Sequence, residues 1–379
     1  MSIPEQPACA AKVVRDADRA AHLPRIALKG VFLSLPLAYL WFRLINNLWP
    51  EWTTNPQYGF GLLVPLLCFG LLIRRWHSHT QAGVREFIVG RSRLAVLSFG
   101  ILALLYLPTR LIEAATPEWR PIQWLLGIES IGLSFCVIEL SLGRGWLRQL
   151  AFPVLFFFVA IPWPSLVEQP IIQNLTQLSA AIVTEALGFL GIPALAHGNV
   201  IEVATGVVGV DEACSGIRSF QSSLMISLFF GEFYRLSCGR RCLLIPIGFA
   251  FAIAFNVCRM SWLTTVAARK GISAIAEYHD PAGITIAIAC TVALWGLAWL
   301  LLKRQHKEEK RGEASAYAKL RRDGEGRGQK SAVSGQWSSS QKSEVATADS
   351  AIPTLHPPPS TLNSQLSTFC LSVLSYGWS

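Results

Sequence analysis

The chain is poor in charge. Only 15% of its 379 residues are Asp, Glu, Lys or Arg, whereas 52% are hydrophobic, and soluble proteins average about 25% charged residues. The composition therefore argues against a water-soluble domain. The apolar residues form long runs, such as 94–107 and 242–258. A helical span needs roughly 20 mostly apolar residues, and a span in lipid must satisfy its own backbone polar groups. The sequence predicts an all-α integral membrane protein.

Several functional motifs are missing. No GxxxxGK[ST] sequence is present to cradle phosphates. Cys238 and Cys242 flank Gly-Arg-Arg with no His or further Cys nearby, so we expect no metal and no cofactor. The net charge of +9 resides in short blocks between apolar runs. That is the arrangement that orients membrane proteins, and not a basic stripe for nucleic acid, which we exclude as a partner.

The apolar runs predict about eight transmembrane helices. Lys and Arg gather before the first, and after the second, fourth, sixth and eighth, which the positive-inside rule assigns to the cytoplasm. We therefore expect a multi-pass protein of the plasma (inner) membrane with both termini cytoplasmic. The first run is too long and Trp-rich for a cleaved signal peptide, so we expect it to be retained. The exceptions to the charge pattern are Arg110, Arg120, Arg269 and Lys270. The predicted spans cover residues 26–48, 58–73, 94–112, 122–142, 150–163, 216–230, 242–263 and 282–302.

The predicted organisation has three parts. A cytoplasmic N-terminal segment (1–25) precedes a transmembrane domain (26–305), and a tail rich in Ser, Gly, Gln and Pro follows (306–379), which we expect to be disordered and cytoplasmic.

Residues 164–213 form the predicted extracytoplasmic segment, which contains acidic residues and no Lys or Arg. Its first half, 166–190, repeats apolar residues at helical spacing and predicts an amphipathic helix at the outer interface. Its second half, 199–210, is rich in Val and Gly and predicts a short outer β-hairpin.

The predicted topology brings three reactive side chains to the outer face. Cys214 begins the sixth span, Arg259 lies near the outer end of the seventh, and His279 lies in the loop before the eighth. A thiolate is the nucleophilic form of cysteine, and a cation or a helix N-terminus favours it. His279 can accept and return a proton, and the Arg259 guanidinium suits an oxyanion or a substrate carboxylate.

Each assignment has an alternative. Cys258 is a second thiol beside Arg259, but its apolar surroundings indicate packing, and His197 is the alternative base. Arg259 could instead be a snorkelling anchor, although a charge at the edge of a span is a functional candidate by default. Arg218, one turn after Cys214, could bind substrate or orient Glu212. Arg218, Ser215 and Asn256 are the candidate substrate-binding residues.

Three strings carry a resemblance to a known family. DEACSGIRS (Asp211 to Ser219), FNVCR (Phe255 to Arg259) and HDPAG (His279 to Gly283) occur in an order that resembles the exosortase/archaeosortase family. The likeness covers about residues 26–305. The stretch Gln57 to Gly61 also looks like that family's early outer loop, although Phe60 stands where His is common.

The resemblance implies a membrane-bound cysteine sorting protease or transpeptidase. Its partners would be the lipid bilayer, an unknown acceptor molecule, and exported proteins ending in a short motif such as Pro-Glu-Pro, one helix and a basic cluster. Cys214 would be the nucleophile, with Arg259 and His279 as its partners. Two functions of other classes stay open: a transporter or a non-catalytic scaffold for envelope or exopolysaccharide assembly.

Overall fold

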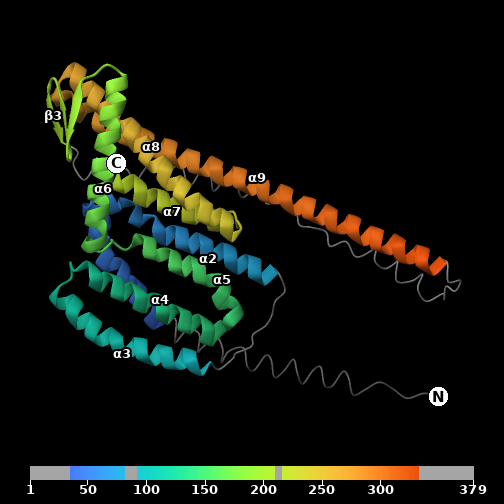
Figure 1. Cartoon of the computed structure of the whole chain (residues 1–379). Helices are drawn as coiled ribbons and strands as arrows, with labels where there is room; N and C mark the ends of the chain where they lie inside the picture. The colour runs from blue at the N-terminus through green and yellow to red at the C-terminus, as the bar shows by residue number, and fades with distance from the viewer. Residues whose placement is uncertain (1–34, 82–91, 210–215, 333–379) are drawn as a thin grey trace, which may run out of the picture.

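The computed structural model describes residues 35–81, 92–209 and 216–332 and is predominantly helical (Figure 1). The helical class predicted from the sequence is confirmed. After a helix at 35–54 the elements are η1 (Pro56–Leu62), α2 (Val64–Gln81), α3 (Arg93–Ala115), α4 (Arg120–Leu142), α5 (Arg144–Leu155), η2 (Phe156–Ala160), α6 (Ser165–Phe189), β1 (Ala194–His197), β2 (Val200–Val203), β3 (Gly206–Gly209), α7 (Ile217–Phe233), α8 (Cys238–Lys270), η4 (Ile272–Ala274) and α9 (Ile275–Ala332).

The helices form a bundle with two different ends. In Figure 1, α2, α4, α5 and α7 run side by side, whereas α6 runs across one end of them and the sheet lies at that same end. We call this the α6 end. The opposite end, where α2 and α4 finish and α8 begins, is the arginine end. It carries Arg75, Arg144, Arg235, Arg240 and Arg241.

Among the described residues, fewer helices than the eight predicted spans are long and apolar enough to cross a membrane. Five helices among the described residues are long and apolar enough to cross a membrane, and a sixth follows if the bent pair 144–160 and 165–189 counts as one span. α7 has 17 residues, and the fifth predicted span is divided between α5 and η2. A multi-pass membrane protein is supported, whereas the count of eight is not.

The bend before α6 is sharp. The helical segments on its two sides are inclined by 71°, and the break at 161–164 contains Pro162 and Pro164, which lack backbone N–H donors. The helix predicted at 166–190 is present as α6. That α6 lies at a membrane interface stays a prediction, but its direction across the end of the bundle agrees with an interfacial position (Figure 1).

A small antiparallel sheet follows α6. Its order is β1-β2-β3, and β2 with β3 forms a hairpin inside the range predicted from the sequence. The additional strand β1 pairs His197 with Val200 across Gly198, whose φ of 64° suits a tight turn. The sequence did not indicate β1, because Ala-Leu-Ala-His lacks the β-branched residues typical of strands.

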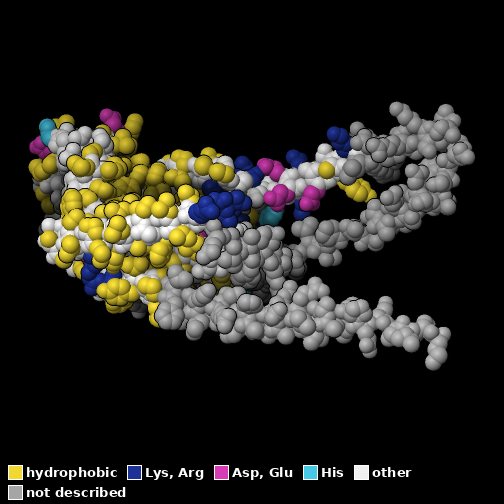
Figure 2. All heavy atoms as spheres, turned by 90° about the horizontal axis from the view of Figure 1, so that it is seen from below, with side chains coloured by type: hydrophobic (Ala, Val, Ile, Leu, Met, Phe, Trp, Pro, Cys, Tyr) yellow, Lys and Arg dark blue, Asp and Glu magenta, His cyan; other side chains and the backbone are white. Residues whose placement is uncertain are grey.

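Two clusters of buried side chains hold the helices and the sheet together. The larger joins the 35–54 helix, η1, α2, η2, α7 and α9, and includes Leu48, Phe157 and Leu294. The smaller joins α6, the sheet and α8 through residues such as Leu187, Ile201 and Met260. Outside these clusters hydrophobic side chains cover much of the bundle surface, as expected for contact with lipid (Figure 2).

The last helix extends into the segment for which the composition predicts disorder. α9 continues through residues 306–332, where the composition predicted disorder. The segment 303–319 is rich in Lys, Glu and Ala, which are strong helix formers, and Gln305 accepts a hydrogen bond from the Ser237 backbone N–H at 3.0 Å. The structure gives residues 306–332 a helical conformation, and the disorder expected for the tail stays a prediction. Residues 333–379 lie outside the described residues.

Candidate active site

Two of the sequence motifs meet at the start of α7. Gly216 caps α7 with a φ of 85°, in the left-handed region that favours glycine. A Cβ built on Gly216 would lie 2.7 Å from Nδ2 of Asn256, in the middle of α8. The first motif therefore has to carry glycine at this position, and it lies directly against the second.

The second and third motifs meet one turn further along α8. Arg259 lies on the same side of α8 as Asn256, because residues three apart are neighbours on a helix. A Cβ built on Gly283 of α9 would lie 3.5 Å from Nη1 of Arg259. The guanidinium therefore rests close to the α9 backbone. The start of α7 and the first turns of α9 therefore both meet the face of α8 that holds Asn256 and Arg259.

The support beneath this face is apolar. Asn256 is buried, and its amide donates to Sδ of Met260 at 3.7 Å. Met260 belongs to the cluster that includes Val183 of α6 and Ile201 of β2. In addition, Thr205 donates to the backbone oxygen of Ala267 at 2.9 Å. These contacts fix α6 and the sheet against α8 beside the converging motifs.

His279 lies on a helix and not in the predicted loop. α9 begins at Ile275, so His279 and Pro281 belong to its first turns. The sequence predicted a polar loop up to Pro281 and a span from 282, whereas in the structure the helix passes through Pro281. His279 is partly buried. Its neighbour Tyr278 accepts a hydrogen bond from Nζ of Lys270 at 2.9 Å, which ties the start of α9 to the end of α8.

Two predicted residues fall outside the described structure. Cys214 and Ser215 lie in the segment 210–215, which is not among the described residues. Arg218, the third candidate for substrate binding, is described and partly buried in the first turn of α7.

The alternatives occupy different environments. Cys258 is exposed on α8, a helix that is long and apolar enough to cross a membrane, and its expected role in packing stays a prediction. Cys258 and Arg259 lie on different faces of α8, because successive residues of a helix are rotated by about 100°. His197 is also exposed, and its Nε2 lies 3.4 Å from Oε2 of Glu202 on the neighbouring strand.

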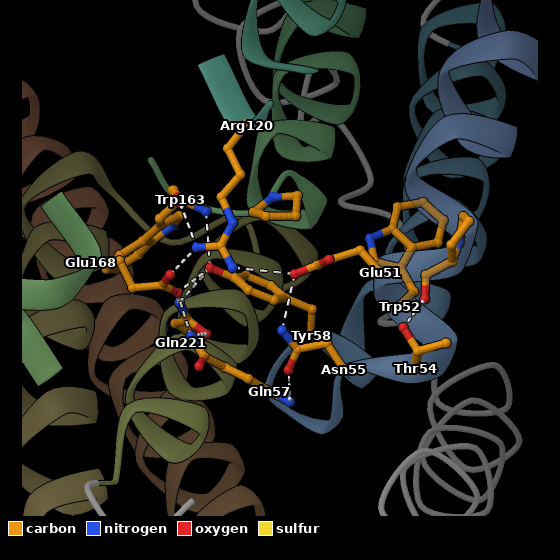
Figure 3. A network of polar contacts seen from close by, with 12 residues as sticks. Glu51, Trp52, Thr54, Asn55, Gln57, Tyr58, Arg120, Trp163, Glu168 and Gln221 are labelled. Carbon is orange, nitrogen blue, oxygen red and sulfur yellow. Dashed lines mark hydrogen bonds and ion pairs between the residues drawn. The ribbon is translucent and has the colours of Figure 1, made fainter. Parts of the chain in front are cut away.

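A buried polar network that the sequence did not indicate lies at the same α6 end (Figure 3). Its centre is Glu168, a buried carboxylate in the first turn of α6. Arg120 forms an ion pair with it, while Gln57 and Tyr58 donate hydrogen bonds to it. Gln221 of α7 also donates to it, at 3.5 Å.

The network extends beyond Glu168. Arg120 donates to the backbone oxygen of Trp163 at 3.1 Å and lies 3.3 Å from Oε1 of Glu51. The Tyr58 hydroxyl accepts from the Trp163 backbone N–H at 3.0 Å and from Gln221 at 3.4 Å. Two signals in the sequence were available: Arg120 broke the positive-inside pattern, and Gln57 to Gly61 formed part of the resemblance.

Comparison with known proteins identifies the chain at the level of a family. The model of the transmembrane exosortases matches residues 52–296. No curated protein and no solved structure matches the chain. The matched range contains all three motifs, Glu168 with its partners Gln57, Tyr58, Arg120 and Gln221, and every helix from α2 to α8.

Proposed function

The chain belongs to the transmembrane exosortase family, and we propose that it is a membrane-embedded cysteine protease or transpeptidase that acts on exported proteins with a C-terminal sorting signal. The signal would be of the Pro-Glu-Pro type, followed by one helix and a basic cluster. The reaction would take place at the extracytoplasmic face of the plasma (inner) membrane and would transfer or release the exported protein.

The observation that carries this proposal is the convergence of the three motifs on α8. Gly216 lies against Asn256, and Gly283 lies close to Arg259. Cys214 precedes Gly216 by two residues, a stretch that spans at most about 7 Å. A thiol near the N-terminus of α7, a guanidinium on α8 and an imidazole on the first turns of α9 thus belong to one end of the bundle.

The chemistry assigned to these residues is acyl transfer. Cys214, as thiolate, attacks the carbonyl carbon of the scissile peptide bond, and the charge that develops on the carbonyl oxygen is stabilised by Arg259. His279 holds the thiol proton and returns it to the amine of the leaving C-terminal fragment. The remaining thioester is then attacked by water or an acceptor amine, which releases the product and restores the thiol.

Substrate binding is assigned to residues beside the thiol. Ser215 and Arg218 flank the start of α7, and Arg218 offers a charge for an acidic sorting motif. Asn256 was a further candidate for substrate binding. Because Asn256 is buried and contacts Gly216, its side chain is better suited to supporting the α7 start than to touching the substrate.

The test uses co-expression with an exported protein that bears such a signal. We expect Cys214→Ala and Cys214→Ser to insert normally but to leave the substrate unprocessed. Cys258→Ala is the matched control, because it removes the neighbouring exposed thiol, and it should process normally. His279→Ala should slow processing by about 10²–10⁴-fold, the usual range for general acid–base catalysis. Normal maturation of the substrate by the Cys214→Ala protein would rule out the proposed enzymatic activity and favour the scaffold function.

A further inference from the structure

We propose that the Glu168 network is a positioning device that holds the first half of α7, and with it the nucleophile, in register with Arg259 on α8. This inference rests on the proposed function, since it assigns the task of positioning residues to Glu168, Tyr58 and Arg120. None of the three is proposed to touch the substrate.

The first observation in support is the burial of the Glu168 carboxylate, which costs free energy. Glu168 is a carboxylate with 2% of its side chain exposed, and burying a charge is expensive unless it is paired and hydrogen-bonded. Its partners come from η1, α4 and α7, which are separated in the chain by 48 to 111 residues from Glu168. The network therefore forms only when these segments are assembled with α6 at one end of the bundle (Figure 3).

The second support is the contact with α7. Gln221 donates to both Glu168 and Tyr58 and accepts from Nε2 of Gln57 at 3.4 Å. Gln221 is almost completely buried and lies one helical turn after Ile217. Its amide thus ties the first turns of α7 to a group of side chains that are themselves fixed by the ion pair.

The third support is the path onward to α8. Phe220, beside Gln221, stacks on Phe249 of α8 with ring centroids 3.8 Å apart, and Trp163 of the network meets Phe220 edge-on. One turn earlier, Gly216 touches Asn256. A shift of Gln221 therefore changes how α7 sits on α8 at the point where the motifs converge.

The chain provides a matched control in Glu232, at the other end of α7. Glu232 is buried as deeply as Glu168 and is paired with Arg75 and Arg241. It holds the end of α7 that is remote from Gly216. A merely structural role predicts similar consequences for both glutamates, whereas a positioning role predicts an effect on the reaction only for Glu168.

The experiment compares Glu168→Gln, Tyr58→Phe and Glu232→Gln in the full chain. The first readout is the alkylation rate of Cys214 relative to exposed Cys238, measured by residue-resolved mass spectrometry on the membrane-inserted protein without substrate. The second is the processing of a sorting-signal substrate, divided into kcat and KM. Melting of each variant in detergent reports the structural contribution separately.

We expect Glu168→Gln and Tyr58→Phe to change the Cys214 alkylation ratio and to lower kcat with little change in KM. A displacement of about 1 Å can cost about 10²-fold in rate. Glu232→Gln should lower the melting temperature and leave the alkylation ratio unchanged. If all three variants give the wild-type ratio, or if all three alter it equally, the positioning inference is wrong. Because this readout needs no substrate, it is independent of the Cys214→Ala test of the proposed function.

Discussion

Glu168 at the α6 end and Glu232 at the arginine end are both buried among arginine and polar side chains, but their charges are balanced differently. At the arginine end Glu232 is paired with both Arg75 and Arg241, and Arg241 also donates to the backbone oxygen of Leu236 at 2.8 Å. At the α6 end, in the part of the chain that the structure describes, Glu168 pairs with one cation, Arg120, and its other donors are neutral. The first cluster has two arginines for one glutamate, whereas the second, with Glu51 included, has two glutamates for one arginine.

This difference explains the exceptions to the charge pattern. Arg120 lies at the end predicted to be extracytoplasmic, and its charge is matched by Glu168 and Glu51. Arg110, on the same side, is paired with Glu113. Two of the four cations that break the pattern, Arg110 and Arg120, thus have acidic partners beside them. By contrast, Arg235 lies outside the helices near Arg75, and burial together with that neighbouring charge lowers the pKa of Arg235.

The largest expected effect concerns the sides of the membrane. If the two ends face opposite compartments, a cysteine introduced at Gly239 should resist an impermeant maleimide in intact cells. Cysteines at Gln177 or Ser273 should be labelled, and all three positions are exposed. The experiment requires a background without the nine native cysteines. Labelling at 239 but not at 177 would reverse the orientation.

The second-largest expected effect concerns the number of arginines paired with each buried glutamate. Arg120→Ala leaves Glu168 without a positive partner, and breaking a buried ion pair costs about 3–5 kcal/mol. Arg75→Ala leaves Glu232 with Arg241, so the loss should be smaller. Melting temperatures of the purified proteins in detergent would check this order. Equal losses would show that the neutral donors stabilise Glu168 as well as a second arginine does.

The third effect concerns backbone strain. Gly216→Ala places a Cβ against Asn256 at a φ of 85°, where an L-residue costs about 1–2 kcal/mol. Gly143, with a φ of 91°, is the counterpart between α4 and α5 at the arginine end. Both alanine variants should melt earlier, but only Gly216→Ala should reduce substrate processing. Normal processing by Gly216→Ala would argue that the contact with Asn256 does not matter for the reaction.

The smallest effect is expected at the surface of the arginine end. Glu308 is largely exposed and pairs with Arg240, and such pairs contribute about 0.2–1 kcal/mol. Glu308→Ala should leave both the melting temperature and processing close to wild type. A large loss of stability would indicate that this contact between α9 and the start of α8 holds the bundle together.

The sequence predicted those features that depend on neighbouring residues. Apolar periodicity gave α6 to within one residue at each end, and Val-rich segments gave the β2–β3 hairpin. The start of α9 was missed, because the segment before Pro281 is polar and the predicted span began only with the apolar run at 282.

Long-range pairing could not be predicted in the same way. Tyr58 and Glu168 are 110 residues apart, and nothing in the local pattern of either segment specifies the other. The order of Cys214, Arg259 and His279 along alternating spans did indicate a shared end. The contacts of Gly216 with Asn256 and of Gly283 with Arg259 depend on how three helices pack, which periodicity does not encode.

The central claim is that the reaction proceeds through a covalent bond to Cys214. The most direct measurement is mass spectrometry of the protein recovered from cells that express a sorting-signal substrate, with His279→Ala used to slow resolution of the intermediate. The account predicts the N-terminal part of the substrate attached to Cys214 through a thioester that hydroxylamine cleaves. Processed substrate with no adduct on Cys214, together with normal processing by Cys214→Ala, would contradict it.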